Sequence, residues 1–531
     1  MKRLLLILSI VTAFWTAACS SGGSSVTPPP PTGNFSAANL NGQYAFVTSG
    51  EVFTPGSISA IPLSRVGSFT ADGQGHITGG VEDVNSAGTV NPPVAITGGS
   101  YTVNADGRGF MTLLFGQSSI TFGITLTSTN DGLLIDETFN SNQASTGSGN
   151  FIKQNSSSFA VSAVAGPYVF DFSGLDGNQN IQCPCPESLV GRFDASSGVI
   201  GAGFFDDNDN ANFSNGSFIG TLSTDPLNPQ EPITNSGRGI ASIAGQNFVF
   251  YIVDSNRVRF LSTNLGMLSG DSVAQSSNVP ADVSGLNSGF VFVVAGASGT
   301  GGLTRIGRFT ANGASLINVL MDTNNAGAFA QTNSATSTAV TLDPANPGRG
   351  TITFTANNFQ VPLSFVFYLN SATQGVIQET TQSTSGVAAA VADGSIAAQS
   401  GSPFTSSNVK GTYAFNWSGL SIQNGGSFAV QDEEDLVGQA SVSSLNLSGA
   451  ADIFQFQSAV GPKTNLGVGG SITIRGDGTG GDGQRSTITV NLTGANPINF
   501  VVYFVNPQLA FFANTSTSST RIVVGILKAQ Q

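Results

Sequence analysis

Carboxylate and amide side chains recur at one place in this sequence, each time after a run of alternating β-type residues. The three copies are Asp83-Val84-Asn85, Asp206-Asp207-Asn208 and Asp322-Thr323-Asn324. Such short polar side chains commonly end a strand by bonding the nearby backbone. The oxygens of Asp206, Asn208 and Asn210 also have the one-three-five spacing of calcium loops, without the following Gly and the distal Glu. We therefore expect no cofactor and no metal, with calcium at these three residues as the alternative.

Other residues that could carry chemistry are few. His76 is the only histidine and no Gly-x-Ser-x-Gly motif is present, so His76 is expected to be an exposed strand residue and not part of a relay. Cys183 and Cys185 are too few to hold zinc and are expected to pair with each other or with another molecule. The run Asp432-Glu433-Glu434-Asp435 is the only dense acidic cluster that could give a glycosidase its two carboxylates. We predict no catalytic residue.

These residues lie in four related repeats. Each repeat opens with a Gly and a β-type aromatic segment, as in Leu40-Asn41-Gly42-Gln43-Tyr44-Ala45-Phe46, and the four glycines are Gly42, Gly166, Gly285 and Gly411. Their spacings of 124, 119 and 126 residues are each the length of one domain. Further landmarks follow in the same order: a Gly-Arg-Gly turn, an aromatic strand such as Phe248-Val249-Phe250-Tyr251, and a closing Gln.

Within a repeat the pattern predicts strands throughout. In repeat 1 we expect eight, near residues 42–50, 64–72, 76–84, 98–105, 108–116, 118–128, 132–139 and 148–154. Tight turns at Asp72-Gly73 and Asp106-Gly107 supply the positive φ that hairpins need. The fold class predicted is all-β, with four tandem eight-stranded up-and-down barrels. These resemble lipocalin barrels in strand count only, and β-sandwiches or one propeller are the alternatives.

The longer loops follow the first and third strands, so in a barrel they rim the same end. Binding residues concentrate on such loops. We therefore expect any ligand to bind at this end, the mouth of the barrel, and not at the end that carries the tight turns. The candidate mouth residues are Asp83, Cys183, Cys185, Asp206, Asn208, Asp322, Asp432 and Glu433.

The N-terminus predicts export. Lys2 and Arg3 precede a short apolar stretch that ends at Thr16-Ala17-Ala18-Cys19. This run resembles the lipobox of bacterial lipoproteins, which implies that Cys19 is lipidated and becomes the mature N-terminus; a plain secretory signal is the alternative. The domains expected are a signal peptide and lipobox (1–19), a Gly/Ser/Pro-rich tether (20–34) and four β repeats at 35–155, 159–276, 281–399 and 407–531.

Composition narrows the function. The net charge of −13 disfavours nucleic acid and anionic membrane surfaces as partners. With 7 Tyr and 2 Trp, the chain is poor in the residues that belt a membrane barrel. We expect a non-enzymatic binding, adhesion or structural module, lipid-anchored at Cys19 in the envelope, at the outer membrane or cell surface. Its partner is an unidentified small molecule, glycan or protein; an envelope hydrolase or a scaffold of a larger assembly is the alternative.

Overall fold

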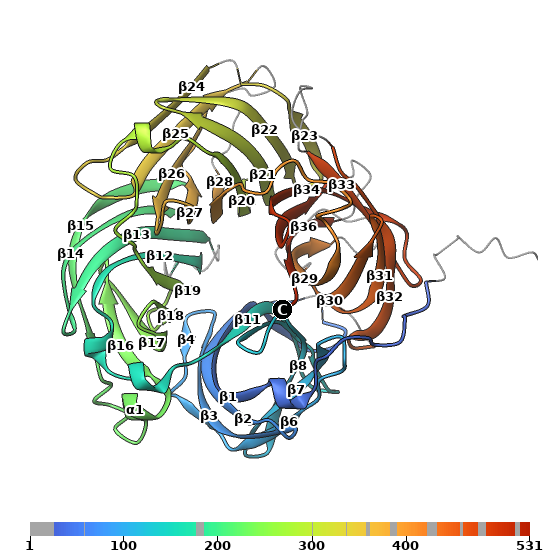
Figure 1. Ribbon diagram of the computed structural model, residues 1–531. Coiled ribbons are helices and arrows are strands. Elements are labelled where there is room, and N and C mark those ends of the chain that lie inside the picture. The colour runs from blue at the N-terminus through green and yellow to red at the C-terminus, as the bar shows by residue number, and fades with distance from the viewer. Residues whose placement is uncertain are drawn as a thin grey trace, which may run out of the picture.

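Four β units form a ring in the computed structural model (Figure 1). The model describes residues 26–57, 59–176, 185–299, 301–335, 337–356, 362–382, 390–421, 433–456, 460–475, 485–515 and 521–531. The predicted signal peptide, lipobox and first part of the tether lie outside these ranges. No helix among the described residues is long and apolar enough to cross a membrane.

The elements follow the sequence repeats. Repeat 1 contains η1 (Ala37–Asn39), β1 (Asn41–Phe53), β2 (Ala60–Asp72), β3 (His76–Ser86), β4 (Thr89–Val90), β5 (Val94–Ile96), β6 (Gly98–Tyr101), β7 (Arg108–Phe115), β8 (Ser118–Leu126), β9 (Asp131–Asp136), β10 (Thr138–Phe139) and β11 (Ala144–Lys153). Repeat 2 follows η2 (Ser156–Ser158) and η3 (Val161–Ala163), with β12 (Gly166–Leu175), β13 (Pro186–Ser196), β14 (Val199–Asp209), β15 (Asn212–Ser223), α1 (Ile233–Ser236), β16 (Arg238–Ile243), β17 (Gln246–Asp254), β18 (Arg257–Ser262) and β19 (Met267–Ala274).

The second half of the chain repeats this order. Repeat 3 contains η4 (Val283–Gly285), β20 (Gly289–Ser298), β21 (Gly301–Asn312), β22 (Ser315–Asn325), β23 (Ala328–Thr332), β24 (Ser337–Leu342), β25 (Arg349–Thr355), β26 (Leu363–Leu369), β27 (Gln374–Glu379) and β28 (Ala390–Ala398). Repeat 4 contains β29 (Gly411–Ser421), β30 (Glu433–Ser443), β31 (Asn446–Gln455), β32 (Lys463–Thr473), β33 (Ser486–Leu492), β34 (Ile498–Asn506), β35 (Leu509–Asn514) and β36 (Arg521–Ala529).

Each repeat is an antiparallel meander whose first strand pairs with its last. This pairing closes repeats 1, 2 and 4 into barrels. Repeat 3 stays open between β23 and β24, although Thr338 bonds the backbone of Leu316 across the gap. The prediction of eight-stranded up-and-down barrels is confirmed, with repeat 3 as an incomplete barrel, and the sandwich and propeller alternatives are wrong. The expected turns are present, since Gly73 and Gly107 have φ of 77° and 85°.

The barrels are filled by their own side chains. Alternate residues of every strand point inward, so Tyr44, Phe46 and Phe69 pack with other aromatic rings in the core of repeat 1. Burying each such ring contributes roughly 1.5–3 kcal/mol. The cores of repeats 3 and 4 enclose cavities of about 10 and 20 Å³, space for one water molecule at most. The described cores of repeats 3 and 4 therefore have no room for a ligand of the kind that lipocalin barrels carry.

The outward faces of the first strands build the joints between repeats. At the joint of repeats 1 and 2, Ala45, Val66 and Val81 pack against Val249 and Tyr251. Similar apolar clusters join repeats 2 and 3 and repeats 3 and 4. A fourth cluster joins repeat 4 back to repeat 1, which closes the ring (Figure 1).

The described part of the expected tether is docked on the ring. In Figure 1 the segment before β1 runs along repeat 4. The carbonyl of Val26 accepts a hydrogen bond from Thr493. A Cβ added at Gly467 would lie 2.3 Å from the carbonyl oxygen of Val26, so this close approach requires glycine. Phe35 then donates its N–H to the carbonyl of Ala105 in repeat 1 at 3.2 Å. The segment thus spans the joint between the last and the first repeat.

Candidate functional site at the joints between repeats

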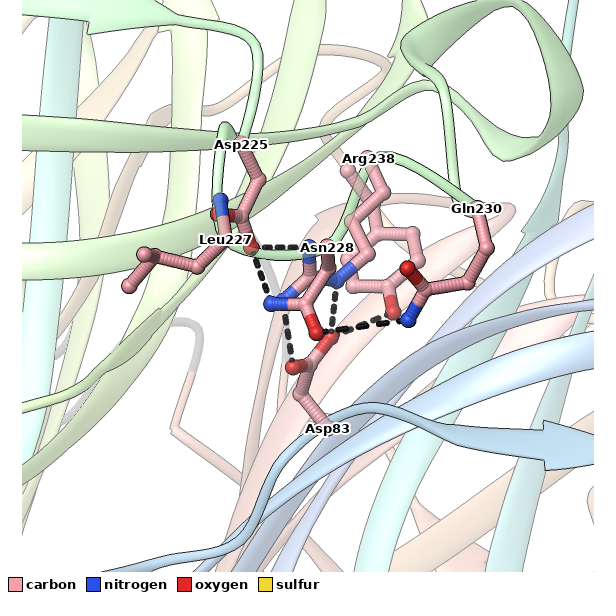
Figure 2. Close-up of polar contacts among 7 residues, drawn as sticks. Asp83, Asp225, Leu227, Asn228, Gln230 and Arg238 are labelled. Carbon is pink, nitrogen blue, oxygen red and sulfur yellow. Dashed lines mark hydrogen bonds and ion pairs between the residues drawn. The ribbon is translucent and has the colours of Figure 1, made fainter.

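The recurring carboxylate lies at a joint and binds the recurring arginine of the next repeat. Asp83 on β3 accepts hydrogen bonds from Nε and Nη2 of Arg238, both at 2.8 Å. Arg238 also donates from Nη1 to Asp225 at 2.7 Å. Figure 2 shows Asp83 reaching from the strand of repeat 1 to the loop of repeat 2 that carries Asp225 and the start of β16. The two landmarks of the sequence repeat are therefore each other's partners.

The aromatic strand supplies the third member of this cluster. The hydroxyl of Tyr251 on β17 donates to Asp83 Oδ2 at 2.6 Å. Burial and the neighbouring charge of Asp83 raise the pKa of Tyr251 well above its ordinary value, so it stays a donor. Burial disfavours the charge of Arg238, but its bonds to Asp83 outweigh this and raise its pKa. The joint thus contains a buried ion pair in which both charged groups have hydrogen-bond partners.

The same triad recurs at the next two joints. Asp206 accepts from Nε and Nη2 of Arg349, both at 2.7 Å, and from the hydroxyl of Tyr368 at 2.5 Å. Between repeats 3 and 4, Asp322 Oδ2 accepts from Arg485 Nε at 2.8 Å and from the hydroxyl of Tyr503 at 2.6 Å. The recurring arginines therefore form ion pairs that join different repeats.

The recurring amides hold the backbones of adjacent repeats together. Asn208 donates from Nδ2 to the carbonyls of Glu379 and Ala390 at 3.0 and 2.9 Å. Asn85 and Asn324 make the equivalent bonds at their own joints. The closing glutamines Gln154, Gln275, Gln399 and Gln530 also donate to carbonyls of the following repeat. The recurring carboxylate, amide, arginine and closing glutamine therefore all contribute to joints.

The joint that closes the ring has a different composition. Thr125 stands where the other repeats have the tyrosine, and Phe454 where they have the asparagine. Arg108 bonds Asp106 of its own repeat at 2.8 Å and Asn465 of repeat 4 at 3.2 Å. Phe454 packs against aromatic rings of repeat 1. This joint keeps the arginine and the closing glutamine but loses the complete triad.

The closing joint also buries carboxyl groups beside one another. Glu433 and Asp435 project from β30 toward repeat 1, where Thr146 donates to Asp435 at 2.6 Å. Burial, followed by the charges of Asp435 and Glu51, raises the pKa of Glu433 well above its ordinary value. Burial raises the pKa of Asp435 to about 7. Protons therefore remain on this cluster near neutral pH.

The residues predicted for a shared ligand mouth do not come together. Asp83, Asp206, Asn208 and Asp322 are buried at three separate joints, where the next repeat occupies their oxygen and nitrogen atoms. Glu433 lies at the closing joint. Cys185 is disulfide-bonded at the start of β13, whereas Cys183 and Asp432 lie outside the described residues. This placement does not support a mouth lined by the joint residues.

The alternative calcium set is also dispersed. Asp206 and Asn208 face a joint from within β14, and Asn210 lies in the tight turn after it, with φ of 49°. The described residues contain no group of three His, Cys, Asp or Glu side chains placed to hold a metal. His76 begins β3, where its Nδ1 lies 2.8 Å from Asp72 Oδ2 and its side chain is 68% exposed.

An open groove lies on the outside of the joint between repeats 2 and 3. Its volume is about 830 Å³. Phe204, Phe218 and Ile219 provide apolar surface, and Ile219 is 79% exposed. The ion pair of Arg192 and Asp194, with an N–O distance of 2.9 Å, also lines it. Sequence patterns did not single out this groove, because its walls come from two repeats.

Comparisons with known proteins identify no family. No family matches this chain, and no curated protein matches it in sequence. Among solved structures, a transferrin binding protein B (TbpB) double mutant from Haemophilus parasuis Hp5 is 10% identical, covering 96% of this chain and 98% of that chain with a TM-score of 0.21. TbpB from serogroup B Neisseria meningitidis is 11% identical, covering 76% and 84% with a TM-score of 0.18. Scores of this size say nothing about what this chain binds.

Proposed function

We propose that this chain is a lipid-anchored envelope protein, displayed at the outer membrane or cell surface, that binds a partner without catalysis. Cys19 carries the lipid, and the ring is a rigid platform whose charged landmarks are used in holding the repeats together. The described cores of repeats 3 and 4 enclose no more space than one water molecule takes, which favours recognition on the outer surface of the ring. Adhesion is the form of binding that such a platform suits.

The groove between repeats 2 and 3 carries this proposal. Exposed apolar surface with charged groups at its edge is typical of interaction sites on monomeric proteins. Arg349 lies over the ring of Phe204, 5.1 Å from its centroid, and so fixes one wall of the groove from the neighbouring repeat. The apolar lining favours a protein partner over a glycan, because no indole ring is present for stacking on a sugar.

Substitution at the groove tests the binding role. Peptides selected on the mature wild-type chain from a random displayed library are expected to lose binding to Ile219→Asp. They are expected to retain binding to Leu227→Asp, a matched change at a residue that is 87% exposed outside the groove. Equal binding to both variants would show that the groove is not the recognition surface.

Fractionation tests the anchor. A Cys19→Ser variant is expected to move from the membrane fraction to the soluble fraction, because the acyl chains that hold the protein in the bilayer can no longer be attached. Membrane association equal to that of the parent would contradict lipidation at Cys19.

The hydrolase alternative lacks an accessible pair of carboxylates in the described part of the acidic cluster. Glu434 and Asp435 are fully buried, and Glu434 is bonded to Arg521 at 2.7 Å. A glycosidase needs two carboxyl groups on opposite sides of a bound sugar. The scaffold alternative differs from the proposal only in the partner, which would be another envelope protein.

A further inference from the structure

Four carboxylates lie at the mouth of the second barrel, the end at which β12 stops and β13 begins. Asp176 follows β12, Glu187 lies near the start of β13, and Asp207 and Asp209 lie near the end of β14. Glu187 pairs directly with Asp209 across the two strands. Because side chains alternate along a strand, these residues face the same way as the core residues Leu189 and Phe193. The four side chains therefore point into the mouth, whereas Asp206 and Asn208 point away from it.

Glu187 is buried there without a counter-charge. Its relative exposure is 6%, and its side chain has no hydrogen-bond or ion-pair partner among the described residues. The charged groups that act on Glu187 are all carboxylates, those of Asp207, Asp209 and Asp176. One oxygen of Asp207 and one of Asp209 are also buried without a hydrogen-bond partner. Burial, followed by the charges of Asp207, Asp209 and Asp176, raises the pKa of Glu187 to about 8, because its charged form has no counter-charge there, so this mouth favours a positive group.

Repeat 4 shows how the same position is satisfied. Glu434 pairs with Gly419 as Glu187 pairs with Gly174, so the two glutamates occupy equivalent places in their barrels. In repeat 4 the guanidinium of Arg521 donates to both oxygens of Glu434, at 2.7 and 3.0 Å. Trp417 Nε1 adds a third bond, at 3.1 Å.

In repeat 2 the corresponding last strand begins at Met267 and brings no basic side chain to this end. The second barrel therefore has the carboxylates of such a site, in larger number, without the cation.

We propose that the mouth of the second barrel binds a cationic group of a ligand, an ammonium or a guanidinium, in the place that Arg521 takes in repeat 4. The described carboxylates do not converge as they would around a bare metal ion, which favours the larger, hydrogen-bonding cation. This site is separate from the apolar groove, and it does not depend on the lipid anchor or on the identity of the groove's partner.

Titration calorimetry of the mature chain with spermidine and with arginine amide tests the proposal. We expect saturable binding of at least one of them, weakened about tenfold or more by Glu187→Gln, because a charge-assisted bond contributes roughly 1.5–3 kcal/mol. Asp254→Asn is the matched control, since this carboxylate of repeat 2 lies at the end of β17, away from the mouth, where its Oδ1 accepts hydrogen bonds from the backbone N–H groups of Asn256 and Arg257 at 2.7 and 3.1 Å. Its affinity is expected to equal that of the wild type.

Three outcomes would overturn the proposal. The first is the absence of saturable binding by both organic cations. The second is binding that Glu187→Gln and Asp254→Asn weaken equally, which would indicate nonspecific attraction to an acidic protein. The third is saturable binding of Ca²⁺ that depends on Glu187 while neither organic cation binds, which would make the site a metal site. Melting temperatures measured with each probe separate these outcomes from unfolding of a variant.

Discussion

Removal of the Asp83 carboxylate tests the structural role of the joints. In Asp83→Ala, Arg238 loses two bonds of 2.8 Å and Tyr251 loses one of 2.6 Å. Removing one partner of a buried ion pair costs roughly 3–5 kcal/mol. Because Asp225 still neutralises part of the charge of Arg238, we expect a loss near the lower end, about 3 kcal/mol.

Hydrogen exchange of the mature chain in increasing denaturant is the suitable assay, because a chain of four domains need not unfold in one step. Protection should fall in β3 and β16 on the two sides of the altered joint and stay unchanged at the joint of repeats 3 and 4. The control is Asp194→Ala, which removes a partly exposed carboxylate and should cost less than about 1 kcal/mol.

A double-mutant cycle of Asp83 and Arg238 tests whether the two side chains stabilise the joint together. Once Asp83 is absent, Arg238→Ala should cost less than it does in the wild type, since it removes an already poorly paired charge. Strictly additive losses, or a loss for Asp83→Ala no larger than that for Asp194→Ala, would refute the view that the triad holds repeats 1 and 2 together.

Three further predictions follow from the ring. Burial raises the pKa of Asp435 to about 7. The stability that protonation of Asp435 contributes is therefore fully present below pH 4 and lost as the pH rises through 7. The melting temperature should fall from pH 5 to 8, and it should fall less in Asp435→Asn. Gln530→Ala leaves the carbonyls of Asp106 and Leu126 without the amide that donates to each at 2.8 Å. The free energy of opening measured by hydrogen exchange should therefore fall by roughly 1–3 kcal/mol at the closing joint, whereas Gln154→Ala should lower it at the first joint instead. Residues 159–276 expressed alone should show a folded β spectrum by circular dichroism, because their core is complete. They should melt at a lower temperature than the full chain and self-associate, because the apolar faces of their two joints are exposed.

Local patterning was sufficient to predict the strands. Alternation of β-type residues between Gly and Asp turns placed the predicted segments 76–84 and 118–128 close to β3 and β8. The recurrence of glycine-led openings divided the chain into four units of domain length. These features depend on neighbours in sequence and on period-2 burial, both of which are visible in one chain. The eight-stranded meander follows from them, because tight turns force consecutive strands to pair.

The function of the charged landmarks was not visible in the same way. The bond partners Asp83 and Arg238 are 155 residues apart, and Asp206 and Arg349 are 143 apart. No local rule connects such positions, so the recurring carboxylates were interpreted as turn, calcium or mouth residues. Repetition of both landmarks along the chain was the available signal, because a residue that repeats in every unit of an array can serve the contact between units.

The sequence by itself determined the four repeats, their strands and the acidic character of the chain. Only the tertiary structure decided which face each side chain serves. Asp206 and Asp207 are adjacent in sequence, yet one closes a joint against Arg349 and the other faces the mouth of the second barrel. A shift of one residue in register would exchange their roles, and that register is fixed by the packing of the whole barrel. Closure of the ring was likewise decided by contacts between the first and the last repeat, which no single repeat encodes.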